Sequence, residues 1–402
     1  MKLKPYPKYK PSGIEWLGGV PDSWKILRLK RIAEFRYGDS LPSEGRVDGD
    51  VPVFGSNGIV GTHSVANTRS PAIIIGRKGS FGKVAFAENA AFSIDTTYFV
   101  DGDCTSANLR WLYYCLQTLG LDSFSQDTGV PGLSRDDAYS KVISYPPLLD
   151  QSIIATFLDR ETAKIDALIS KQEKLIELLQ EKRQAVISHA VTKGLDPEVP
   201  MKPSGVEWLG DVPEHWDRVM LGRLCKQVSD GPHFSPSYVD DGVMFISARN
   251  IKVNGWALDD AKFISQEDYV EFSRRVIPEI GDILYTKGGT TGIARVVDLQ
   301  QPFQVWVHVA VLKIDRELAD PYYVAYALNS VGCFEQSQLF TRGATNQDLG
   351  LTRMTQIWTT RPPLTEQRAI VEQLDEETSK IDTLIAKAQQ AIELQKEPPV
   401  SD

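Results

Sequence analysis

Two glycine-rich, basic segments of the chain carry the residue types that hold phosphate groups. Each follows an apolar run, and they read Gly-Arg-Lys-Gly-Ser-Phe-Gly-Lys at 76–83 and Lys-Gly-Gly-Thr-Thr-Gly at 287–292. Small residues let a backbone approach a ligand closely, and Lys, Arg, Ser and Thr side chains contact phosphates. The alternative is a tight β-turn with solvated lysines. The candidate phosphate contacts are Arg77, Lys78, Gly79, Ser80, Lys83, Lys287, Gly288, Gly289, Thr290, Thr291 and Arg295.

Further polar loops carry side chains suited to the edges of nucleic-acid bases. Arginine pairs with guanine, and asparagine or glutamine with adenine, through two parallel hydrogen bonds. Each of these residues could equally be an ordinary loop residue, so the prediction depends on their lying near the basic loops. The candidates for base contacts are Ser56, Asn57, Arg249, Asn250, Arg342, Asn346 and Gln347.

No grouping of side chains predicts catalysis or metal binding. The segment 76–83 lacks the spacing of a P-loop, and Val84 stands where a magnesium-binding Ser or Thr is needed. The Pro-Pro pairs at 146–147 and 362–363 lack the flanking residues of the amino-methyltransferase motif. The five histidines and four cysteines show no metal-ligand spacing. We therefore expect a chain without catalytic residues, metal or cofactor of its own.

The elements that carry these loops are duplicated. Lys-Pro-Ser-Gly-Ile-Glu-Trp-Leu-Gly at 10–18 returns with one substitution at 202–210, and Lys-Ile-Asp-x-Leu-Ile at 164–169 returns at 380–385. The inserts between the repeated boxes have largely lost their similarity. Short β-branched runs predict strands at 51–54, 72–75, 243–246 and 305–312, and helices are expected at 107–119 and 321–329. Each insert is therefore a mixed α/β domain.

Each insert ends on Pro-Pro-Leu and leads into a long segment without proline or glycine, 151–192 and 367–395. Apolar residues recur there at the spacing of a coiled-coil seam. Two such helices in a duplicated chain most simply pair with each other in antiparallel fashion; the rival is that each packs only on its own domain. The residues expected to pair the helices or to dock a partner are Ile165, Leu168, Leu175, Leu179, Ile381, Leu384 and Ile385.

The predicted fold class is α/β (α+β), with two pseudo-symmetric domains separated by two long helices that form an antiparallel coiled coil. The first box and domain occupy 1–148, and the first helix occupies 149–194. The linker, second box and second domain occupy 195–363, and the second helix and tail occupy 364–402.

Composition is that of an ordinary globular protein, with a net charge of −9 over 402 residues. Such a charge argues against wholesale nucleic-acid binding, because phosphate contacts need Lys and Arg. The charge is uneven, however, with net +3 over 1–19 and net −5 over 364–402. No apolar run is long enough for a membrane span, so we expect a cytoplasmic protein with reduced thiols.

In combination these motifs resemble the specificity subunit of Type I restriction-modification systems. The resemblance rests on the paired Trp-bearing boxes, the Pro-Pro-Leu-x-(Asp/Glu)-Gln helix starts, the Lys-Ile-Asp-x-Leu-Ile helices and the Gly-Ser-Asn-Gly and Lys-Gly loops. It implies that each insert is a target-recognition domain reading one half of a split, asymmetric sequence in double-stranded DNA. It also implies partners: two methyltransferase subunits that use S-adenosylmethionine, and restriction subunits that use ATP and Mg²⁺.

Two other classes remain open. The chain could be a structural coiled-coil scaffold that never binds DNA, or the recognition fragment of a fused methyltransferase-nuclease enzyme. A scaffold has no need of two divergent inserts with matching basic loops, and an enzyme needs catalytic motifs that the sequence lacks.

Overall fold

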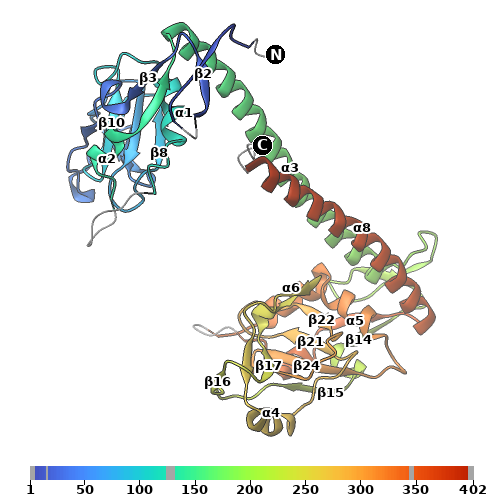
Figure 1. Ribbon diagram of the computed structural model, residues 1–402. Helices are drawn as coiled ribbons and strands as arrows, with labels where there is room; N and C mark the ends of the chain where they lie inside the picture. The colour runs from blue at the N-terminus through green and yellow to red at the C-terminus, as the bar shows by residue number, and fades with distance from the viewer. Residues whose placement is uncertain (1–4, 15–16, 124–131, 344–347, 397–402) are drawn as a thin grey trace. The chain divides into compact units, whose positions relative to one another are not determined.

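The computed structural model describes residues 5–14, 17–123, 132–343 and 348–396. The chain divides into two compact units, Met1–Ala167 and Leu168–Asp402, which are described in turn (Figure 1). The long helix α3 (Leu148–Lys193) runs from the first unit into the second. Among the described residues, no helix combines the length and the apolar character needed to cross a membrane.

The first unit is built on an antiparallel four-stranded sheet and a smaller three-stranded sheet. In spatial order the larger sheet contains β4 (Arg36–Tyr37), β10 (Thr97–Asp101), β7 (Ala72–Gly76) and β8 (Val84–Ala87). The smaller sheet contains β6 (Gly58–His63), β5 (Val51–Gly55) and β9 (Phe92–Ser93), with β5 and β9 parallel. The remaining elements are the β1–β2 hairpin (Tyr9–Pro11, Gly19–Pro21), the β3–β11 pair (Lys25–Arg28, Val142–Tyr145), α1 (Leu109–Gln117) and α2 (Arg135–Ser140).

The second unit repeats this plan with additions. Its larger sheet contains β15 (Cys225–Asp230), β24 (Val309–Ile314), β21 (Ile283–Thr286) and β22 (Ala294–Val296). Its second sheet contains β16 (Tyr238–Val239), β20 (Lys262–Ile264), β17 (Val243–Ile246) and β23 (Phe303–Val305). The other paired strands are β12–β13 (Met201–Pro203, Asp211–Pro213), β14–β25 (Asp217–Met220, Trp358–Arg361) and β18–β19 (Ile251–Lys252, Gly255–Trp256). The helices are α4 (Gln266–Ser273), α5 (Pro321–Leu328), α6 (Val331–Phe340), α7 (Leu351–Met354) and α8 (Leu364–Lys396).

The two larger sheets have the same strand order, so β4, β10, β7 and β8 correspond to β15, β24, β21 and β22. In each smaller sheet one parallel pair, β5–β9 or β17–β23, also recurs. The duplication that the repeated boxes predict therefore extends into the inserts, where the sequences differ most. The mixed α/β class with two tandem domains and long helices is confirmed.

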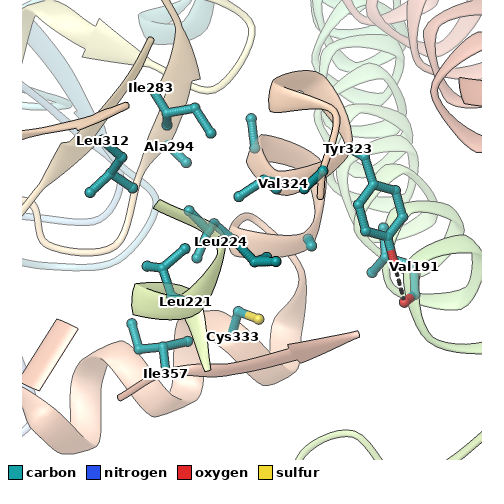
Figure 2. Close-up of a cluster of buried hydrophobic side chains, with 14 of the residues drawn as sticks. Val191, Leu221, Leu224, Ile283, Ala294, Leu312, Tyr323, Val324, Cys333 and Ile357 are labelled. Atoms are coloured by element: carbon teal, nitrogen blue, oxygen red, sulfur yellow. Dashed lines mark hydrogen bonds between the residues drawn. The ribbon is translucent and has the colours of Figure 1, made fainter. Parts of the chain in front are cut away.

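A single core in the second unit joins the sheet to both long helices. Val191 of α3 and Ile370 of α8 are buried in the same cluster as Leu312 and Tyr323 of the domain. Figure 2 shows part of this cluster, including the hydroxyl of Tyr323, which donates to the carbonyl oxygen of Val191 at 3.3 Å. Fully burying each aliphatic side chain contributes about 1.5–3 kcal/mol, so the domain is firmly attached to the helices.

Within the second unit, α8 lies beside the C-terminal half of α3 (Figure 1). Arg183 Nε donates to Asp382 Oδ1 at 3.0 Å, while a Cβ built on Gly194 would lie 3.4 Å from Oε1 of Glu366. Residue numbers therefore rise along α3 as they fall along α8, so the pairing is antiparallel, as expected. Gly194, at φ +78°, follows the last residue of α3 in the left-handed conformation that glycine adopts readily.

The apolar stripe of these helices divides into covered and uncovered positions. Ile381 is buried, and Leu179 and Ile385 are half-buried. Four positions remain exposed, namely Ile165 (39%), Leu168 (47%), Leu175 (43%) and Leu384 (50%). The stripe is thus wider than the contact between the two helices.

The glutamine of the repeated Pro-Pro-Leu motif links each domain to its long helix. Gln151 is fully buried; its Nε2 donates to Pro146 O at 2.8 Å, and its Oε1 accepts from the backbone N–H of Asn108 at 2.8 Å. In the second unit Gln367 makes the same two bonds, to Pro362 O and from the N–H of Asp320, both at 2.8 Å.

A second duplicated contact lies about two helical turns further along. Tyr114 donates to Asp159 Oδ1 at 2.6 Å, and Tyr326 donates to Asp375 Oδ1 at the same distance. The repeated motifs therefore encode the attachment of each domain to its helix, which positions the loops of that domain.

Candidate nucleic-acid interface

The two basic, glycine-rich loops have the same backbone structure. In the first, which joins β7 to β8, the N–H of Gly82 donates to Gly76 O at 2.9 Å. In the second, which joins β21 to β22, the N–H of Gly292 donates to Thr286 O at 3.0 Å. Since the loops connect equivalent strands with equivalent hydrogen bonds, we call them loop 1 (77–83) and loop 2 (287–293).

Glycines in the left-handed region explain the composition of both loops. Gly79 and Gly289 have φ of +73° and +74°, and Gly82 and Gly292 have φ of +78° and +97°. A side chain at any of these positions would strain the backbone. The glycines are therefore required for the turn itself, and at Gly79 and Gly289 the loop backbone is exposed.

Backbone hydrogen bonds from the first residue of each loop show which residues of loop 1 and loop 2 are equivalent. The N–H of Arg77 donates to Thr96 O at 2.8 Å, and the N–H of Lys287 donates to His308 O at 2.9 Å. Lys287 is therefore the counterpart of Arg77, and Gly288 is the counterpart of Lys78. Matching the loops by residue type, lysine with lysine, gives a register that is wrong by one position.

Arg77 keeps its positive charge close to the surface. Its guanidinium lies 4.9 Å from the ring centroid of Tyr37 and 5.9 Å from that of Tyr98, and Arg135 lies 5.1 Å from the Tyr37 ring. Burial raises the pKa of Tyr98 to about 12, so this ring remains a neutral phenol at physiological pH. Among the described residues no carboxylate pairs with Arg77, so its charge is free to attract an anion.

Lys287 occupies the same backbone position but is buried and ion-paired. Its side chain is 5% exposed, with Nζ at 2.8 Å from Asp348 Oδ1 and 3.4 Å from Asp230 Oδ2. Arg275 pairs with Asp230 as well. The ammonium therefore lies away from the surface on which a phosphate contact was expected, because two carboxylates remote in sequence neutralise it.

The remaining candidates of the first domain gather at loop 1. Lys83 Nζ donates to Asn57 Oδ1 at 2.6 Å, and a Cβ built on Gly79 would lie 3.5 Å from Ser56 Oγ. Lys78 is exposed and Ser80 is half-buried. The structure thus brings Ser56, Asn57, Arg77, Lys78, Gly79, Ser80 and Lys83 to one end of the larger sheet.

In the second domain Arg249, Asn250, Gly288, Gly289 and Thr290 line one pocket of about 740 Å³. Arg249 is exposed and lies 3.4 Å from Asp260, a pairing that contributes little at the surface. Asn250 is only 1% exposed, because its amide is used to hold its own loop.

Three other candidates of this domain lie apart from the pocket. Thr291 is buried, and the backbone of Arg342 pairs with that of Asp348 beside loop 2. Arg295 lies on β22, with its guanidinium 4.8 Å from the Trp256 ring centroid and 3.0 Å from Asp298. Asn346 and Gln347 lie outside the described residues.

Sequence reasoning missed the aromatic residues beside both loops. Tyr37 and Tyr98 flank loop 1, while Trp306 and His308 flank loop 2. Tyr98, Trp306 and His308 lie on or beside strands that pair with the loop-bearing strands, and Tyr37 lies one strand further on β4, so strand pairing is the signal that would have found them. Within the described part of the chain, no cluster of three or more His, Cys, Asp or Glu residues could hold a metal ion.

Comparison with known families agrees with this duplicated architecture. The family model described as Type I restriction modification DNA specificity domain matches residues 21–178 and 213–394. The chain belongs to this family. The two matched segments cover both α/β domains and most of both long helices, so the Type I specificity architecture applies to the chain as a whole.

Individual members of the family match over almost the whole chain. The Type I restriction enzyme MjaVIII specificity subunit of Methanocaldococcus jannaschii is 25% identical over 399 residues, covering 94% of this chain and 91% of that protein. The EcoBI specificity subunit of Escherichia coli is 22% identical over 403 residues, covering 94% and 84%.

One solved structure shares the fold. It comes from work described as the structural basis underlying complex assembly and conformational transition of the type I R-M system. The TM-score is 0.69 at 15% identity, with 94% of this chain and 95% of that chain covered.

Proposed function

We propose that this chain is the non-catalytic DNA-specificity subunit of a Type I restriction-modification complex. The observation that carries the proposal is the construction of loops 1 and 2 on equivalent strands, with identical backbone hydrogen bonds but different surroundings. Two domains that recognise unlike half-sites need the same backbone structure with different side chains. Membership of the Type I specificity family supports the same conclusion.

Each domain would read one half of a bipartite, asymmetric target in double-stranded DNA. In the first domain, Arg77 and Lys78 would contact phosphates, while Ser56 and Asn57 lie close enough to loop 1 to reach base edges. In the second domain Arg249 is an exposed candidate cation that lines the pocket beside loop 2, whereas Lys287 is buried and ion-paired.

The partners would supply the chemistry. The uncovered positions Leu168, Leu175 and Leu384 give a methyltransferase subunit an apolar surface on the long helices. The proposal assigns S-adenosylmethionine to two such subunits, and ATP and Mg²⁺ to restriction subunits, with no cofactor in this chain. It places the assembled complex in the cytoplasm with the host DNA. A coiled-coil scaffold accounts for the helices but not for two matched loops.

Modified-base sequencing of host DNA, with and without this chain, tests the proposal. The expected result is that one split motif with two unlike halves loses methylation when the chain is absent. Loss at a continuous motif, or unchanged methylation in cells that contain the methyltransferase partner, would refute the role. An Arg77→Met/Lys78→Met variant should lower methylation of the same motif without changing its sequence, because phosphate contacts position the domain and carry no sequence information.

A further inference from the structure

The pocket beside loop 2 has walls that the proposed phosphate contacts do not explain. Its volume is about 740 Å³, and four aromatic side chains contribute to it: Tyr238, Phe245, Trp306 and His308. The ring centroids of Trp306 and His308 are 5.1 Å apart in an edge-to-face arrangement. Phe245 is 2% exposed, whereas Tyr238 is 46% exposed, so the rings extend from floor to mouth. Planar apolar surfaces of this kind receive a flat ring by stacking.

Loop 2 is shaped to leave this pocket open. A Cβ built on Gly288 would lie 2.2 Å from Nδ1 of His308, so no side chain fits between the loop and the imidazole. That Nδ1 atom is buried without a hydrogen-bond partner among the described residues. Nε2 is the ring nitrogen farther from Gly288, because the atoms nearest to that Cβ position are Nδ1, Cγ and Cε1. The pocket therefore combines an aromatic surface with a polar group that has no partner within the described chain.

The charge at the pocket is positive. Lys262 and Arg249 both contribute to the lining, and both are exposed. Lys262 forms no ion pair with a described residue, and the carboxylate near Arg249 is itself exposed, so neither charge is strongly neutralised. Cations beside an aromatic pocket match a base that is attached to a phosphate backbone.

The first domain has no aromatic residue at the positions equivalent to Trp306 and His308. Ile94 is the counterpart of Trp306, because their backbone N–H groups donate to equivalent strands. The N–H of Ile94 donates to Phe54 O of β5 at 3.0 Å, and the N–H of Trp306 donates to Ile246 O of β17 at 2.9 Å. Thr96 is the counterpart of His308, because their carbonyl oxygens accept hydrogen bonds from the N–H groups of Arg77 and Lys287. The pocket beside loop 2 is therefore built differently from the one beside loop 1, which has a volume of about 670 Å³ and is lined by Tyr37 and Tyr98 together with Arg77 and Lys78.

We propose that this pocket binds a single unstacked nucleobase of the bound DNA, with Trp306 as the stacking surface and His308 Nε2 facing the edge of the base. The inference rests on the proposed function and deepens it, since it names Trp306 and His308 as specificity-determining residues of the second domain. A base within a duplex offers only its edges to a protein, so a pocket with a buried floor requires the base to leave the stack. The free-energy cost of leaving is offset by stacking inside the pocket.

The test uses the complex of this chain with its methyltransferase subunits and a set of target duplexes. Each duplex carries one abasic site, moved through the half-site of the second domain. Thr290 lies at the exposed edge of the pocket, so Thr290→Trp fills the pocket without altering the core. Trp306→Ala removes the stacking surface as a second variant. Val270→Trp, at an exposed position of α4 outside the pocket lining, is the matched control.

The expected result is that Thr290→Trp and Trp306→Ala weaken binding of intact DNA by about 5-fold to about 100-fold, the range for losing one base–aromatic stack. At one abasic position the wild type and both variants should bind alike, because without the base neither its stacking in the pocket nor the cost of unstacking it contributes. Val270→Trp should match the wild type. Full affinity and an unchanged abasic profile for both pocket variants would overturn the inference.

A free nucleotide is the other source of the same chemistry. Titration of the complex with each deoxynucleoside monophosphate, followed by tryptophan fluorescence, separates the two sources. Saturable quenching that Thr290→Trp abolishes, together with no abasic position that removes a difference between the variants and the wild type, would assign the pocket to free nucleotides and overturn the DNA source. If the wild type binds no bipartite target, the proposed function fails. If it binds one but the pocket variants behave like Val270→Trp, only the pocket inference fails.

Discussion

Equivalent cations in the two loops should have opposite roles, which the matched substitutions Arg77→Met and Lys287→Met can test. Methionine keeps the apolar stem and removes the charge. Removing one partner of a buried ion pair costs about 3–5 kcal/mol. Asp230 retains Arg275 and Asp348 is partly exposed, so we expect Lys287→Met to lower the free energy of unfolding of the second unit by about 2–3 kcal/mol.

That loss corresponds to a fall of about 4–12 °C in the melting temperature of a unit of this size. Arg77→Met removes interactions with aromatic rings near the surface, worth about 0.5–1 kcal/mol each, and one exposed hydrogen bond to the carbonyl oxygen of Asp95, so its melting temperature should stay close to that of the wild type. Differential scanning calorimetry of the full chain measures both values.

DNA binding should show the reverse order. Each lost phosphate contact reduces the slope of log K against log salt by about 0.9. Arg77→Met should show this change and bind about 10-fold more weakly, whereas folded Lys287→Met should keep the wild-type slope. A stable Lys287→Met protein with a reduced salt slope would refute the reasoning, because it would show that the buried lysine is the phosphate contact.

Three further predictions concern the helices and their attachment. Gln367→Ala should lower the free energy of unfolding by about 2–4 kcal/mol in urea titrations, because it leaves a buried N–H and a buried carbonyl unpaired, while exposed Gln389→Ala should have little effect. Leu175→Glu should abolish co-purification of the methyltransferase subunit without changing the melting temperature; retained co-purification would exclude this part of the stripe from docking. Desolvation tends to raise the pKa of Asp159, but hydrogen bonds from Tyr114 and a neighbouring arginine lower it below its usual value. The ionised carboxylate therefore stabilises the first unit above the unfolded pKa, about 3.9, and that stability is lost as pH falls through the folded pKa. Tyr114→Phe should raise the folded pKa and reduce the stability lost between pH 5 and 2 in acid titrations; an unchanged acid profile would contradict this.

Periodicity and proline placement located the long helices well. Helices expected from residues 151 and 367 begin at Leu148 and Leu364, each three residues earlier, directly after the Pro-Pro pair. The apolar run 305–312, expected as one strand, is broken into β23 and β24. Trp306 and His308 lie in this break. The apolar run in the sequence did not indicate the break, because such a run does not reveal a turn that a neighbouring strand imposes.

The candidate site was predictable in its location but not in its electrostatics. Glycine spacing identified both loops, since glycines at positive φ are needed for these turns. The environment of Lys287 could not be predicted, because Asp348 lies 61 residues away in sequence and only strand pairing brings it near. Asn250 likewise looked like a base-reading amide, but its hydrogen bonds are made within its own loop.

The central claim is that each domain reads its own half of one target. The most direct measurement is modified-base sequencing in cells where the insert 217–361 is replaced by the corresponding insert of another family member. The account predicts that one half of the methylated motif changes and the other half, together with the requirement for Arg77, stays the same. A change in both halves, or in neither, would contradict it.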